Sequence, residues 1–376
     1  MPHPFPRMNV RVFTVFLLTG LLLFSVAAMV VLGTGLTRLR DSYGLHLAQI
    51  ADQAAATVDA YVFRRITDAL ILARVPDVRA TAAEGTSRPF DPAVVREIDR
   101  EWTQKRAVPA AVAGLMTNRA SAFLADVVAR SPIYREILLT DRQGRLVAAS
   151  NLTSDYYQAD EDWWYESLGN GVHGRLTVSD VQWDDSARAY AVSIAVPVLD
   201  PSTETLAGIL EVWADIREMG AVIENIRLGT TGEATLLRRN GSIVFSRKPL
   251  DPDAQFFAAD LLREQLGILQ QGQPRSQMYF AARAGDGSTR VVGVGLSQLG
   301  MSYPKLSWLV AVSESEDELY APVRAQAVSL LLVLALMAVA VLTLALWFSM
   351  RLAAPPPEAD LGLVDHPRAR RMEEAA

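Results

Sequence analysis

The chain has 376 residues, a net charge of −6 and no cysteine. The missing cysteines exclude disulfides and thiolate metal sites, and the negative charge without a basic stripe argues against a nucleic-acid partner. The length allows more than one domain.

Two long runs contain no charged residue: Val12 to Leu36, of 25 residues, and Ala327 to Phe348, of 22 residues. Each exceeds the roughly 20 residues that a helix needs to cross a ~30 Å hydrocarbon layer. We therefore predict transmembrane helices over 12–36 and 327–348. The first run is longer than the ~7–15 apolar residues of a cleaved signal peptide, which favours an uncleaved anchor.

Arginines lie at the outer ends of both runs: Arg7 and Arg11 before the first, Arg351 after the second. The positive-inside rule therefore predicts a cytoplasmic N-terminus (1–11), a cytoplasmic tail (349–376) and an external segment between the spans. The expected location is a bacterial inner membrane with a periplasmic domain, which the absence of cysteine suits.

The external segment begins with a predicted long helix, Leu39 to Val75, which ends before Pro76. Apolar residues recur along it every three or four positions, as on one buried helix face. These residues are Ile50, Ala54, Val58, Val62, Ile66, Leu70 and Ala73. Residues 77–130 are expected to form further helices and loops, which makes 38–130 a helical lead-in.

After residue 131 the pattern changes to short apolar strands separated by turns. The predicted strands cover 134–140, 145–150, 189–198, 206–213, 232–239, 242–246, 290–296 and 306–312. We predict an α+β fold with two antiparallel-sheet modules, 131–225 and 226–315, behind the long helix.

The segment Asp155–Gly171 (DYYQADEDWWYESLGNG) contains three tyrosines, two tryptophans and five acids without a lysine or arginine. Unpaired buried carboxylates are costly, so this composition suits a core poorly. It also exceeds what a solvated turn requires. The segment is therefore a candidate ligand-binding region.

Three stretches resemble the double Cache sensor domains of bacterial chemoreceptors and sensor kinases: LLTDRQGRLVA from Leu138, the block Asp155 to Trp164, and SIAVPV from Ser193. The resemblance covers roughly residues 40 to 315. It implies a long helix carrying a membrane-distal and a membrane-proximal PAS-like module, with a small ligand in the distal one.

An amino-acid-binding subset of that family has characteristic pocket residues. By resemblance, the matching positions here are Tyr156, Trp163, Asp184 and Asp215, where the two acids would take the ligand's ammonium group. Three positions depart from the subset. Glu161 stands where the subset has an arginine that would hold the ligand carboxylate, and Trp164 and Gln182 stand where it has tyrosines.

Without that arginine, the site has no planar fork for a carboxylate. Acids and indoles suit a cation, through charge-assisted hydrogen bonds and cation–π contacts, so an amine or polyamine-like ligand is the sharper hypothesis. Alternatively, Trp163 or Trp164 only fills the core and the acids are solvated. A divalent cation is a third reading, but no metal-loop spacing supports it.

No catalytic set, phosphate loop or cofactor motif stands out, so we expect no enzyme activity, no cofactor and no metal. The tail after Arg351 resembles the start of a HAMP linker, without an output module. We expect a sensing receptor, dimeric through Leu39–Val75 and the spans, that acts on a separate effector (a kinase, phosphatase or cyclase). The alternative is a membrane-tethered solute-binding protein without a signalling role.

Overall fold

The structure, a computed structural model, describes residues 10–184, 189–247, 254–270 and 278–352. The chain divides into two compact units. The smaller unit contains Met1–Leu39 and Pro322–Ala376, and the larger contains Arg40–Ala321.

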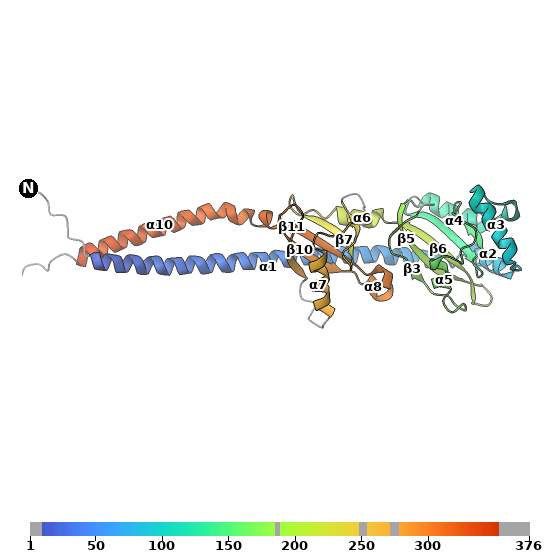
Figure 1. Cartoon of the computed structure of the whole chain (residues 1–376), viewed down its shortest axis with the longest axis horizontal. Helices are drawn as coiled ribbons and strands as arrows, with labels where there is room; N and C mark the ends of the chain where they lie inside the picture. The colour runs from blue at the N-terminus through green and yellow to red at the C-terminus, as the bar shows by residue number, and fades with distance from the viewer. Residues whose placement is uncertain (1–9, 185–188, 248–253, 271–277, 353–376) are drawn as a thin grey trace, which may run out of the picture. The chain divides into compact units, whose positions relative to one another are not determined.

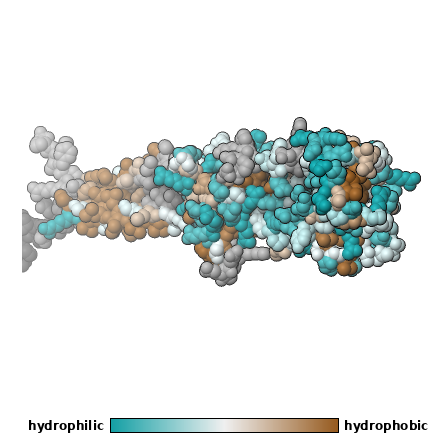
Figure 2. Space-filling view, turned by 45° about the vertical axis from the view of Figure 1, so that its right-hand side comes forward, coloured by the Kyte–Doolittle hydropathy of each residue, from teal (hydrophilic) through white to brown (hydrophobic). Residues whose placement is uncertain are grey.

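The smaller unit is built from the first part of α1 (Val10–Leu72) and from α10 (Ala321–Leu352). The two helices touch, because a Cβ added to Gly20 would lie 2.8 Å from a methyl of Val341. Both uncharged runs are thus helical, and apolar side chains gather over the surface of these helices (Figure 2). Over the residues that the structure describes, no helix combines the length and the apolar character that crossing a membrane demands.

The larger unit contains two antiparallel sheets (Figure 1). The first sheet has the order β2-β1-β6-β5-β3, with β4 also paired to β5. Its strands are β1 (Tyr134–Asp141), β2 (Leu146–Ala149), β3 (Thr177–Val178), β4 (Gln182–Asp184), β5 (Ala189–Leu199) and β6 (Leu206–Asp215). The second sheet has the order β8-β7-β11-β10-β9. Its strands are β7 (Glu233–Arg238), β8 (Ile243–Ser246), β9 (Tyr279–Arg283), β10 (Thr289–Leu296) and β11 (Trp308–Ser315).

The remaining elements are short helices between or beside the strands. They are α2 (Pro76–Ser87), α3 (Pro92–Lys105), η1 (Ala110–Val112), η2 (Leu115–Thr117), α4 (Arg119–Arg130), α5 (Asp162–Leu168), α6 (Arg217–Glu224), α7 (Ala259–Gln270), α8 (Leu299–Ser302), η3 (Pro304–Leu306) and α9 (Glu316–Leu319). The α+β class and the two antiparallel sheets behind a long helix confirm the prediction from sequence.

The outer part of α1 packs against both sheets with the predicted apolar face. Val58 and Val62 are fully buried, whereas Leu70 is 40 % exposed and is the exception. The backbone of α1 lies very close to the backbone of the second sheet. A Cβ on Gly293 would lie 2.2 Å from the Ala48 nitrogen, so only glycine admits the helix backbone there.

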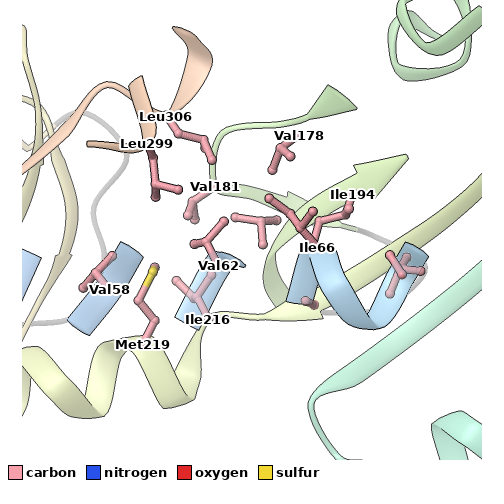
Figure 3. Close-up of a cluster of buried hydrophobic side chains, with 14 of the residues drawn as sticks. Val58, Val62, Ile66, Val178, Val181, Ile194, Ile216, Met219, Leu299 and Leu306 are labelled. Carbon is pink, nitrogen blue, oxygen red and sulfur yellow. The ribbon is translucent and has the colours of Figure 1, made fainter. Parts of the chain in front are cut away.

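A single hydrophobic core joins α1 to both sheets (Figure 3). Val62 and Ile66 of α1 belong to the same buried cluster as Val181 from the first module and Leu306 from the second. The two modules therefore share buried surface in addition to their chain connection.

Several details differ from the prediction. Helix α1 ends at Leu72 rather than Val75, and Pro76 begins the next helix instead of only ending this one. The last predicted strand, 306–312, is displaced to Trp308–Ser315 because residues before it form a 3-10 turn. Several elements were not predicted, namely β3, β4, β9, α5, α6, α7, α8, η3 and α9.

Candidate functional site

The two faces of the first sheet differ in what covers them. One face carries residues such as Ile137, Ile194 and Val212, which belong to the main core with α1 and α2. Side chains alternate between faces along each strand, so the intervening residues point to the opposite face. That opposite face carries polar side chains at its centre.

Four of these residues form what we call the acidic row: Glu136, Ser193, Glu211 and Trp213. In the strand register Glu136 and Ser193 both pair with Trp213, on either side of β6. Glu211 lies two positions before Trp213 on β6, so both side chains are on the same face. The two glutamates are each 1 % exposed, Ser193 is 2 % and Trp213 is 7 % exposed.

The two glutamates of the acidic row are diagonal neighbours on adjacent strands, with Cβ atoms roughly 7 Å apart. Ser193 hydrogen-bonds Glu211, and Asn151 Nδ2 donates to Glu136 Oε1 over 3.2 Å. Both carboxylates are thus buried and hydrogen-bonded on the same sheet face. Buried carboxylates of this kind are groups that can form charge-assisted hydrogen bonds with a cation.

Trp213 adds an open hydrogen-bond donor to the acidic row. No described residue accepts a hydrogen bond from its indole N–H. The nitrogen itself is not fully buried, so it is accessible to a bound molecule.

Helix α5 carries the two tryptophans of the acidic aromatic segment, and they have different environments. Trp164 is 5 % exposed, packs against Ala195 and Ile209, and donates from Nε1 to the Thr140 hydroxyl over 3.1 Å. Trp164 thus fills the core, which is the alternative that the sequence analysis left open for it. Trp163 is half-buried and packs against two separate apolar clusters of the first module.

The other predicted site residues are not gathered at one point. Tyr156 is buried against Trp102, with ring centroids 6.2 Å apart, and Glu161 is exposed at the start of α5. Gln182 is exposed on β4 opposite Ala191. The backbone of Asp184 belongs to β4, but its side chain lies outside the described residues.

Asp215 is buried and already has cationic partners. Arg135 Nε and Arg217 Nε donate to its Oδ2 over 2.7 and 2.8 Å. Its side chain is 5 % exposed. An ammonium group at this carboxylate would have to compete with two guanidinium groups.

Acidic side chains near the aromatic segment have altered proton affinities. Burial, with a smaller contribution from the charge of Asp99, raises the pKa of Asp155 to about 6. Burial also raises the pKa of Glu161, helped by the charges of Asp160 and Asp162. The described residues contain no cluster of histidine, aspartate and glutamate that would hold a metal ion.

The corresponding face of the second sheet is filled by the protein itself. Phe256, Leu262 and Leu266 cover Leu309 and Val294 there in a closed apolar cluster. The acidic row has no such apolar cover among the described clusters, which makes the first module the stronger candidate for ligand binding.

Sequence reasoning missed the whole acidic row. Its signal was present: Glu136 and Glu211 are acids inside strands of largely apolar residues. An acid in such a strand is either on a solvated face or in a polar site, and only the strand register decides which.

Comparison with known proteins identifies the fold family. A family model described as Cache domain (dCache_1) matches residues 37–323. The comparison with curated proteins gave no match.

Several solved structures are similar to this chain. The ligand-binding domain of the Pseudomonas aeruginosa amino acid chemoreceptor PctB, in complex with L-Arg, has 16% identity and a TM-score of 0.42, covering 73% of this chain and 96% of that one. The domain of Campylobacter jejuni Tlp3 with L-norvaline has 12% identity and a TM-score of 0.47, covering 76% and 95%. That of Pseudomonas fluorescens CtaA with L-leucine has 14% identity and a TM-score of 0.45, covering 76% and 100%.

The family match spans well over half of the sequence and coincides with the long helix and the two sheets. The chain therefore belongs to the double Cache (dCache_1) family of sensor domains.

Proposed function

We propose that the chain is a membrane-anchored bacterial receptor whose first module, the membrane-distal one in this reading, binds a small organic cation such as an amine or polyamine. The observation that carries the ligand class is the pair Glu136 and Glu211, each 1 % exposed on one sheet face. A bound cation would form charge-assisted hydrogen bonds with these carboxylates, in addition to those from Asn151 and Ser193. The ring of Trp213 beside them offers a cation–π contact, and in this proposal Trp163 of α5 offers a second one.

The residues expected from the family resemblance have a secondary part in this proposal. Glu161, just before α5, and Gln182, on β4, would border the ligand at the rim. Asp215 already binds Arg135 and Arg217, so the acidic row replaces it as the main counter-charge in the proposal.

Calorimetric titration of the full chain in detergent with putrescine, histamine and choline tests the ligand class, with succinate as the anionic comparison. Glu211→Gln keeps the side-chain shape but removes the charge. It should weaken amine binding by at least about tenfold, because a desolvated charge pair contributes on the order of 2 kcal/mol or more.

Glu136→Gln should act in the same direction, and Glu218→Gln, on the exposed face of α6, is the matched control. Succinate binding that is stronger than amine binding, or equal amine affinity in Glu211→Gln and Glu218→Gln, would refute the cation proposal.

Membrane anchoring is supported by the two uncharged runs and by apolar side chains that are exposed on them. Leu22 is 65 % and Leu336 is 69 % exposed, which is unfavourable in water. The flanking arginines favour cytoplasmic termini. An alkaline phosphatase fused after Ala376 should be inactive in this topology, whereas periplasmic phosphatase activity would contradict it.

Transmission of ligand occupancy is supported by contacts between the modules. Lys305 of the second module donates to Glu166 of α5 over 2.7 Å, one turn from Trp163. Asp180, just before β4, accepts from Trp308 and Arg238 of the second module. Movement of α5 or β4 on ligand binding would therefore displace the residues of the second sheet that contact them. It would also affect α1, which packs on that sheet.

We further propose a homodimer through α1 and a separate cytoplasmic effector. Single cysteines placed along residues 49–60 of this cysteine-free chain would crosslink with helical periodicity, and the pattern would change with amine. Crosslinks that ignore the ligand would favour the alternative, a tethered solute-binding protein without signalling.

A further inference from the structure

A second cavity lies away from the acidic row. It has a volume of about 290 Å³ and is bounded by α2, by the two 3-10 turns and by the hairpin of β1 and β2. None of the acidic-row residues lines it, and of the predicted site residues only Tyr156 does. The volume is near the lower end of the range for small-molecule sites, ~300–1,000 Å³.

Tyr156 presents an unused polar group to this cavity. The residue is only 6 % exposed and its ring packs against Trp102. The charges that act on its hydroxyl are those of Arg145, Asp141 and Arg88, all of which line the cavity. Its hydroxyl forms no hydrogen bond with a described residue.

Burial raises the pKa of Tyr156, so its hydroxyl is a neutral group that can donate one hydrogen bond and accept another. The hydroxyl of Thr81, on α2, also lines the cavity and has no partner among the described residues. A bound molecule would thus meet two groups that each donate and accept.

The charged groups around the cavity are matched with each other. Arg145 Nε donates to Asp141 Oδ2 over 2.6 Å, and its Nη atoms donate to the carbonyls of Pro89 and Gly85 over 2.9 and 2.8 Å. At the rim, Arg88 donates to Glu84 over 2.6 Å. The lining is therefore electrically neutral, and an ionic ligand would find no free counter-charge in it.

We propose that this cavity is a second ligand site, for a small uncharged polyol or sugar-sized molecule that hydrogen-bonds the hydroxyls of Tyr156 and Thr81. It is distinct from the cation site at the acidic row and does not depend on it. The first module would then respond to two chemically unlike solutes.

Gly114 offers a way to close the cavity without disturbing the fold. It lines the cavity with an ordinary φ of −75°, and an added Cβ would meet no atom within 4 Å. Gly114→Leu should therefore fill open space. Gly85 is unsuitable, because its Cβ would lie 2.5 Å from Val147.

The test is calorimetric titration of the full chain in detergent with glycerol, glucose and myo-inositol, and with gluconate and glucosamine as charged counterparts. We expect saturable binding of at least one neutral probe and weaker binding of the charged ones. Tyr156→Phe should weaken the neutral probe by roughly three- to tenfold, the effect of one neutral hydrogen bond. Tyr157→Phe, its partly exposed neighbour, should leave the affinity unchanged.

Gly114→Leu should abolish binding of the neutral probe while its melting temperature without ligand stays that of the parent. Preferential exclusion of polyols raises melting temperatures in all variants alike, so only the calorimetric comparison counts. The absence of saturable heat for every neutral probe overturns the proposal, as does equal affinity in Gly114→Leu and the parent. Loss of amine binding in Glu211→Gln would not change the expected binding of the neutral probe, so the two proposals are tested separately.

Discussion

Asp180 is the best-defined link between the two modules, and its removal has a calculable cost. Its Oδ1 accepts from the Trp308 indole nitrogen over 2.9 Å, and its Oδ2 accepts from Arg238 Nε over 2.5 Å. Trp308 is 1 % exposed, so its N–H cannot turn to water when the carboxylate is lost. The ion pair is about 30% exposed on each side and counts for less.

Asp180→Ala leaves the Trp308 N–H unsatisfied, which costs about 1–3 kcal/mol. The partly exposed ion pair adds up to ~1 kcal/mol. For a unit of this size, a total near 2–3 kcal/mol corresponds to a decrease in melting temperature of roughly 4–12 °C. Asp180→Asn keeps an oxygen acceptor and should cost less than about 1 kcal/mol.

Thermal unfolding of the full chain in detergent, followed by circular dichroism, measures both variants. Trp308→Phe removes the donor, so adding Asp180→Ala to it should cost much less than Asp180→Ala alone. Equal melting temperatures of Asp180→Ala and Asp180→Asn would show that the Trp308 hydrogen bond does not stabilise the module junction.

Three further outcomes are expected. Gly293→Ala should prevent stable folding in thermal melts because its Cβ would lie 2.2 Å from the Ala48 nitrogen, whereas Gly285→Ala, with no atom within 4 Å, should be tolerated. The pKa of Asp155 is raised to about 6, so ionisation of this carboxyl group destabilises the fold as the pH rises towards 6. Asp155→Asn should therefore have a higher melting temperature than the parent at pH 7.5, and this difference should disappear near pH 4. Trp102→Phe should lower the melting temperature, since it removes a buried N–H that donates to the Thr153 carbonyl over 2.9 Å and leaves a gap in the core.

The long-range architecture was largely accessible from the sequence because it rests on repeating patterns. The apolar face of α1 and the alternation in the longer strands are dictated by helix and strand periodicity. The dipeptide Asn240–Gly241 between β7 and β8 is typical of a hairpin turn, and Gly241 adopts a positive φ of 87°. Short elements such as β3, with two residues, have too little pattern to be recognised.

The candidate site was harder to predict because it depends on contacts between distant segments. The sequence contains Asp215, but nothing in it reveals that Arg135, on a neighbouring strand, binds that carboxylate. Likewise Glu136 and Glu211 come together only through the register of β1 against β6. The family resemblance pointed to the first module, while the buried acids became visible only in three dimensions.

The glycines of β10 have a mechanical consequence. Added Cβ atoms at Gly293 and Gly295 would overlap the backbone of α1 near Ala48 and Ala51, so no layer of side chains separates helix from strand. Sliding between packed elements is eased when side chains between them change rotamers, and at these two glycines there is no side chain on the strand to change. The second sheet and this stretch of α1 should therefore move as one rigid body. We therefore expect relative movement, when it occurs, between the first module and the outer turns of α1.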